Sequence, residues 1–168
     1  PNLPVTGEET GEANISQFSE KRLRTYLSTL YWKIIEKALD HGLYVVVRPP
    51  GVCPGGIKVD GYYQDYLLKV WDIVSSNTNI KKHSGQVSIE LANEPVNIYD
   101  ADSLESARAP YDFFQPIVDK IRANGFDGII WVPGTGWQSN YTCYKSNPIE
   151  GYNIGYAVHA YVGWYNNS

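Results

Sequence analysis

The sequence of 168 residues has few positive charges and no long apolar run. Lys and Arg number 14 against 18 Asp and Glu, and the formal net charge is −4, which argues against the broad basic surface of a nucleic-acid-binding protein. The longest apolar run, Leu43 to Val47, has the length of a strand and falls far short of the ~20 residues that cross a membrane. We therefore expect neither a nucleic acid nor a membrane as partner.

Cysteine and histidine are also scarce. Cys53 and Cys143 lie far apart in the sequence and lack the C-x-x-C spacing of a zinc or redox site. The three histidines, His41, His83 and His159, are not spaced as metal ligands either. No G-x-G-x-x-G motif follows an expected strand, which argues against a dinucleotide site. We expect no metal and no cofactor, while the sequence leaves open whether the cysteines form a disulfide.

Aromatic residues are abundant, with 5 Trp, 14 Tyr and 4 Phe. Such amphipathic rings suit stacking against sugars or bases, although a core can also use them. The length fits one domain, and 43% hydrophobic with 19% charged residues is the mix of a globular protein.

Helical and strand patterns alternate along the chain. Apolar residues at three- and four-residue steps predict helices over residues 19–40, 62–74 and 109–123, the first capped by Ser19 and ended by Gly42. Short apolar runs predict strands over residues 43–47, 87–92, 128–132 and 154–161, the first of them buried on both faces. This alternation predicts an α/β fold with a parallel sheet, as either a doubly wound sheet or a (β/α) barrel.

Polar residues stand where the expected strands end. The first strand ends in Arg48, the second in Asn93 and Glu94, and the fourth in His159 and Tyr161. The third leads into a glycine-flanked segment that contains Trp137. Because the functional side chains of a barrel lie at the carboxyl ends of its strands, this placement favours the barrel.

Each candidate has a functional and a structural interpretation. Glu94 follows a buried strand and can reach a cleft, or it is a solvated strand-end glutamate. Glu90, inside that strand, is expected to be a structural carboxylate paired with a neighbour such as Arg48, because an unpaired buried charge is costly. His159 is either a site residue or a satisfied core histidine. Trp137 is either a platform for a sugar or a plug on the barrel mouth.

Three segments, "VSIELANEP", "GIIWVPGTGW" and "YAVHAY", together resemble glycoside hydrolases of clan A, and their order and spacing are similar to those of family 5 cellulases and endo-β-1,4-glucanases. The resemblance covers roughly residues 42–165. It implies a partial (β/α)8 TIM barrel that holds strands 3 to 6 with the intervening helices. Residues 1–168 are then a single, incomplete catalytic domain.

The resemblance also implies roles for particular residues. Glu94 corresponds to the general acid/base, and Asn93 to the residue that binds the sugar 2-hydroxyl. His159 and Tyr161 correspond to a pair beside the nucleophile, and Trp137 to an aromatic residue of the substrate cleft. The implied substrate is a β-1,4-linked glucan polysaccharide or oligosaccharide, and a polymeric substrate implies secretion. The pKa of Glu94 is then expected to be held up by partial burial and by a negative partner carboxylate.

The sequence departs from the family pattern at two places. It reads Arg48-Pro49-Pro50 where relatives often carry a histidine beyond strand 3. The nucleophile glutamate of the family follows strand 7, so we expect it beyond Ser168 and expect little or no hydrolysis by this chain alone. The 168 residues are a piece of a longer polypeptide, or a second chain completes the barrel, or the half-barrel stands alone. A non-catalytic glycan-binding half-barrel is the alternative function.

Overall fold

The computed structural model describes residues 18–49 and 53–161. The helices are α2 (Glu20–Ser28), α3 (Leu30–Asp40), α4 (Tyr62–Ser76), α5 (Thr78–Lys82), α6 (Ala109–Ala123) and α7 (Thr135–Gln138), with a 3₁₀ helix η2 (Thr142–Lys145). The strands are β1 (Val45–Val47), β2 (Gly56–Lys58), β3 (Val87–Glu90), β4 (Asn97–Tyr99), β5 (Ile130–Pro133) and β6 (Ile154–Ala157). No helix within these two stretches is both long enough and apolar enough to cross a membrane.

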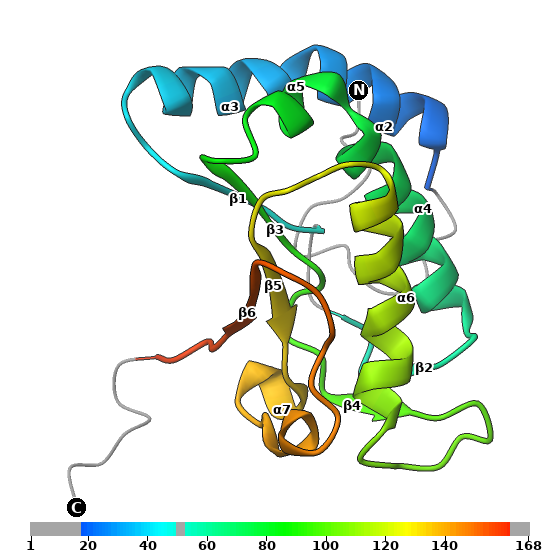
Figure 1. Ribbon diagram of the computed structural model, residues 1–168. Helices are drawn as coiled ribbons and strands as arrows, with labels where there is room; N and C mark the ends of the chain where they lie inside the picture. The colour runs from blue at the N-terminus through cyan, green and yellow to red at the C-terminus, as the bar shows by residue number, and fades with distance from the viewer. Residues whose placement is uncertain (1–17, 50–52, 162–168) are drawn as a thin grey trace, which may run out of the picture.

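Four strands form a parallel sheet in the order β1-β3-β5-β6. The order runs in one direction along the chain, whereas a doubly wound sheet reverses its order near the middle. Helices connect the strands, and α4 and α6 lie side by side on one side of the sheet (Figure 1). The structure therefore confirms the predicted α/β fold and the partial barrel, with β1, β3, β5 and β6 as barrel strands 3 to 6.

The predicted helix over residues 19–40 is in fact two helices, because the backbone breaks at Thr29 (φ −123°, ψ −86°). The hydroxyl groups of Thr25, Ser28 and Thr29 each donate to a carbonyl four residues earlier. Such side-chain bonds compete with regular helix geometry, and the apolar periodicity gave no sign of them. Ser19 caps the first helix, and Gly42 (φ 73°) follows the second, both as predicted.

The first strand is shorter and more open than predicted. β1 covers only Val45–Val47, and Val46 is 52% exposed, so burial on both faces is wrong for this strand. Among the described residues β1 is the edge of the sheet, which leaves it without a neighbour on one side. The strands β3 and β5, in the middle of the sheet, are buried along most of their length.

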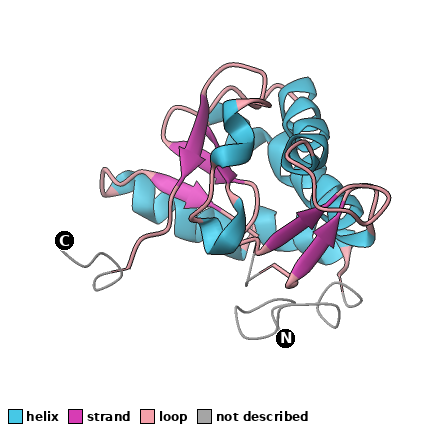
Figure 2. Cartoon of the chain, turned by 90° about the horizontal axis from the view of Figure 1, so that it is seen from below, coloured by secondary structure: helices cyan, strands magenta, loops and turns pink. Residues whose placement is uncertain are grey.

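A second, unpredicted sheet lies at the carboxyl ends of the barrel strands. β2 and β4 pair in parallel, with Ile57 opposite Ile98. Seen from below, these two strands stand apart from the four-stranded sheet (Figure 2). The segment between β1 and α4 therefore contributes a strand, β2, that pairs with the segment after β3.

The core lies between the sheet and the helices α4 and α6. Trp71 and Phe113 are fully buried there, and the indole N–H of Trp71 donates to the carbonyl oxygen of Leu91 at 2.9 Å. Leu91 directly follows β3, so this bond ties the strand end to the core. Cys53 is buried and Cys143 is half-buried, and both are free thiols. Burial raises the pKa of the Cys53 thiol to about 12.

Candidate active site

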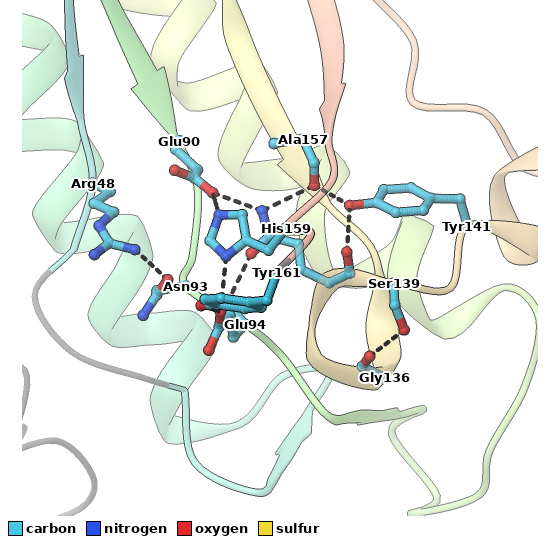
Figure 3. A network of polar contacts seen from close by, with 11 residues as sticks. Arg48, Glu90, Asn93, Glu94, Gly136, Ser139, Tyr141, Ala157, His159 and Tyr161 are labelled. Carbon is cyan, nitrogen blue, oxygen red and sulfur yellow. Dashed lines mark hydrogen bonds and ion pairs between the residues drawn. The ribbon is translucent and has the colours of Figure 1, made fainter. Parts of the chain in front are cut away.

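Side chains from three parts of the chain meet at the carboxyl end of the sheet (Figure 3). Glu90 is the last residue of β3, and Glu94 follows it on the connecting loop with a left-handed backbone (φ 53°). His159 and Tyr161 come from the segment after β6. Left-handed backbone at a residue other than glycine is sparsely populated, and such positions cluster at functional sites.

The Glu94 carboxylate is held by both residues of the His-x-Tyr segment. Its Oε1 accepts a hydrogen bond from the Tyr161 hydroxyl at 2.7 Å and lies 3.0 Å from Nδ1 of His159. The Glu94 side chain is 15% exposed, which leaves it shielded but reachable from solvent. The structure thus brings together Glu94, His159 and Tyr161, which the sequence placed at the ends of two different strands.

His159 stands between two carboxylates. Its second ring nitrogen, Nε2, lies 3.1 Å from Oε1 of Glu90. A neutral imidazole carries one hydrogen only, so both contacts are hydrogen bonds only when the ring is cationic or one carboxyl group holds a proton. Glu90, His159 and Glu94 therefore form one coupled protonic unit.

Glu90 is buried, but the predicted pairing with Arg48 is wrong. The Glu90 oxygen instead accepts a hydrogen bond from Gln138 and lies within hydrogen-bonding distance of Nε2 of His159. Arg48, on the β1 side, donates instead to Oδ1 of Asn93. Asn93, which directly precedes Glu94 in the sequence, is buried, and its side-chain oxygen faces Arg48.

Gln138 was not predicted from the sequence. Its side chain is fully buried, and its Nε2 donates to Oε1 of Glu90 at 2.6 Å and to the carbonyl oxygen of Ala157 at 3.0 Å. Its Oε1 accepts from the backbone N–H of Glu94 at 2.9 Å. One amide therefore joins the ends of β3 and β6 and the loop that carries Glu94. A single glutamine beside Trp137 gives no periodicity or motif that marks it in the sequence.

Trp137 lies beside this network without belonging to it. Its backbone N–H donates to the carbonyl oxygen of Pro95 at 3.0 Å, and its backbone is left-handed (φ 59°). The side chain is 50% exposed, so the ring offers a face to a ligand. The structure places the residue next to the site, and the role of sugar platform stays a prediction.

Comparison with known proteins agrees with this geometry. The family model for cellulase, glycosyl hydrolase family 5, matches residues 6–168. The chain belongs to this family. It is 31% identical over 141 residues to an endoglucanase of Bacillus sp. (strain KSM-635), a match that covers 80% of this chain and 14% of that protein. An endoglucanase of Halalkalibacter akibai is 27% identical over 140 residues, with 78% of this chain and 17% of that protein covered.

Solved structures of family 5 endoglucanases share the fold of this cellulase-family chain. The catalytic domain of Thermobifida fusca endoglucanase Cel5A superimposes with a TM-score of 0.60 at 24% identity, covering 83% of this chain and 44% of that one. XacCel5A in complex with cellopentaose gives a TM-score of 0.59 at 19% identity, with 83% and 46% covered. The chain therefore spans less than half of each of these relatives.

The electrostatics of Glu94 in this cellulase-family chain differ from the prediction of a raised pKa. Burial raises the pKa of the carboxyl group, but hydrogen bonds from His159 and Tyr161 lower it, as do the positive charges of His159 and Arg48. The net pKa is below its usual value. The expected negative partner is not among the described residues near Glu94, so the effect that would raise the pKa is missing from the balance. The same contact raises the pKa of Tyr161.

This lowered pKa predicts how the stability of the domain depends on pH. Because the folded pKa of Glu94 lies below the unfolded value of about 4.5, its ionisation stabilises the fold above that pH. The contribution decreases as the pH falls through the folded pKa. We therefore expect urea unfolding of the 168-residue chain, from pH 6 down to about pH 3, to show a smaller loss of stability for Glu94→Gln than for the wild type. Parallel pH profiles for the two proteins would contradict the assignment.

Within residues 18–49 and 53–161, no three His, Cys, Asp or Glu side chains are grouped so that they could hold a metal. The chemistry available at this site is that of a carboxyl group, an imidazole and a phenol within hydrogen-bonding distance of one another.

Proposed function

We propose that this chain is part of a retaining glycoside hydrolase that acts on β-1,4-linked glucan, with Glu94 as general acid/base. The observation that carries the proposal is the Glu94 carboxylate, placed at the carboxyl end of the barrel strands and held at one oxygen by His159 and Tyr161. The endoglucanases among its relatives favour a hydrolase over a glycan-binding half-barrel. The cellopentaose bound by XacCel5A supports a glucan chain as the ligand.

Retaining hydrolysis needs two carboxyl groups about 5–5.5 Å apart. In the first step the protonated Glu94 gives its proton to the glycosidic oxygen while the second carboxylate attacks the anomeric carbon. In the second step the Glu94 carboxylate takes a proton from a water molecule while the water oxygen attacks the anomeric carbon, and the bond between that carbon and the second carboxylate breaks. We place this second glutamate beyond residue 168. Its negative charge, close to Glu94, would raise the pKa that the described residues lower.

Two neighbours of Glu94 supply contacts for the sugar in this proposal. The Asn93 oxygen accepts from Arg48, which leaves its amide nitrogen as a donor for the 2-hydroxyl. The exposed Trp137 ring suits the flat face of a glucose unit. Because a polymeric glucan is met outside the cell, we also propose that the protein is secreted. The remaining barrel strands come from a further segment of the chain or from a second chain.

The stereochemistry of the first product tests the proposal. When the full-length protein cleaves cellopentaose, we expect ¹H NMR to show the β-anomer before mutarotation, because two inversions at one carbon retain the configuration. The α-anomer as first product would show an inverting enzyme and overturn the retaining mechanism. Binding of cellopentaose without cleavage would support the glycan-binding alternative.

A control uses the 168-residue chain by itself. We expect little or no cleavage of cellopentaose by this chain, because the proposed nucleophile is not part of it. Vigorous cleavage that is lost in Glu94→Gln would require a nucleophile within these 168 residues or from a second copy.

A further inference from the structure

Glu90 is joined to the proposed acid/base, Glu94, through His159. The imidazole of His159 has its Nε2 3.1 Å from Glu90 and its Nδ1 3.0 Å from Glu94 (Figure 3). Glu90 is itself fixed, since its Oε1 also accepts from the buried Gln138 amide at 2.6 Å. The residue is buried at the end of a central strand, where a charged side chain needs partners to be tolerated.

The hydrogen bonds restrict where protons reside in this unit. The Gln138 amide nitrogen donates to Glu90, so the Glu90 oxygen at this contact is an acceptor. When Glu90 is ionised, its oxygen is also an acceptor toward His159, which requires a hydrogen on Nε2. Nδ1 then faces Glu94 with either a lone pair or a second hydrogen. One proton can therefore pass between the Glu94 carboxyl oxygen and Nδ1 without any change at Nε2.

We propose that Glu90 is a positioning residue, which keeps the hydrogen of His159 on Nε2 and thereby presents Nδ1 as the proton partner of Glu94. This inference rests on the proposed function of Glu94. While Glu94 is ionised, the proton resides on Nδ1, and the imidazole is a cation between two carboxylates that the negative charge of Glu90 stabilises. When this proton passes from Nδ1 to the Glu94 oxygen, the imidazole becomes neutral with its hydrogen on Nε2, and Glu94 becomes the protonated acid that the first step needs.

Other charged and titratable groups also face this unit. Arg48 approaches from the β1 side and Tyr161 from the segment after β6, and both lower the pKa of Glu94. Tyr141, from the loop after α7, has its pKa raised to about 12 by burial and in part by the charge of Glu90. The buried Cys53 thiol faces Glu94, and its pKa is raised by burial and in part by the negative charge of Glu94.

Glu90→Gln in the full-length protein removes the charge while keeping the shape of the side chain. The loss of one negative charge makes protonation of His159 and Glu94 less favourable, so the unit takes up its protons only at lower pH. We expect the acidic and the basic limb of the pH profile of kcat/KM on cellopentaose to move to lower pH. The shift should be about one pH unit, the size typical of a charge at this distance. Glu90→Asp keeps the charge, so we expect its limbs to stay in place while kcat falls.

A matched control is Glu36→Gln, the same substitution at an exposed position of α3, which should leave the profile unchanged. If Glu90 has only a structural role, Glu90→Gln and Glu90→Asp will lower stability without moving either limb, and that result overturns the proposal.

A second measurement needs neither a variant of Glu90 nor activity. In the ¹⁵N spectrum of the wild-type full-length protein, the His159 signals are assigned by their loss in His159→Gln. We expect the chemical shift of Nε2 to be that of a hydrogen-bearing nitrogen throughout the range from pH 5 to 8. A bare Nε2 in that range overturns the proposal. An absence of cleavage with a hydrogen-bearing Nε2 contradicts the proposed function but leaves the Glu90 contact confirmed.

Discussion

Glu94→Gln in the full-length protein is expected to lower kcat on cellopentaose by about 10³-fold, while cellopentaose affinity stays within a few-fold of the wild type. Glutamine keeps the shape of the side chain and can still accept from Tyr161, but it neither gives nor takes a proton. General acid/base catalysis contributes about 10²–10⁴-fold, and Glu94 is proposed to act in both steps. The kcat is measured by the release of reducing ends, and affinity by calorimetry.

The leaving group gives this variant a signature of its own. An aryl glycoside whose phenol is a strong acid needs little protonation in the first step, so glycosylation survives in Glu94→Gln. The second step still lacks its base, and the covalent intermediate accumulates. We therefore expect a burst of phenol followed by a slow steady rate with a lowered KM. Glu150→Gln, an exposed glutamate on the loop before β6, is the matched control and should behave as the wild type. Equal activity of both variants would exclude Glu94 as acid/base.

Trp71→Ala is expected to lower the free energy of unfolding of the barrel domain by about 3–5 kcal/mol. The indole ring is fully buried between α4 and the sheet, so its removal leaves a cavity. Its N–H also donates to the Leu91 carbonyl oxygen, three residues before Glu94. The loss therefore loosens the strand end that carries the site. Urea denaturation followed by circular dichroism measures the effect.

Two further variants separate the causes of that destabilisation. Trp71→Phe keeps most of the ring volume and removes the hydrogen bond, so about 1–3 kcal/mol should be lost. Trp137→Ala is the same substitution at a half-exposed ring and should change stability by no more than about 0.5 kcal/mol. Trp137→Ala should instead weaken the binding of cellopentaose, if the ring is the proposed sugar platform. A large loss of stability in Trp137→Ala would indicate a packing role for that ring.

The elements of this fold were predictable where local signals agree. The helix over residues 109–123 was predicted with the bounds it has in the structure, because its apolar face repeats regularly and Asn124-Gly125 follows it. The helix break at Thr29 was missed, since hydroxyl-to-carbonyl bonds leave the apolar pattern intact. The β2–β4 sheet was missed because three-residue strands are too short to show a period.

Of the five predicted site residues, Glu94 contacts His159 and Tyr161, and Asn93 precedes Glu94 in the sequence. Trp137 lies beside these four residues. The placement of Asn93, Glu94, His159 and Tyr161 at one edge of the sheet was predictable, because the carboxyl ends of parallel strands meet there. Gln138 was not found, because its role depends on three partners from distant parts of the chain.

The sequence by itself determined the α/β alternation, the family and the residues at the strand ends. These follow from local periodicity and from short motifs, which a chain carries before it folds. Only the tertiary structure decided the partners: Arg48 with Asn93 rather than Glu90, Gln138 across two strand ends, and His159 between two carboxylates. A buried carboxylate pairs with the donor groups that the packed sheet brings within hydrogen-bonding distance. The distances between such groups from distant parts of the chain are set by the fold and not by the local sequence.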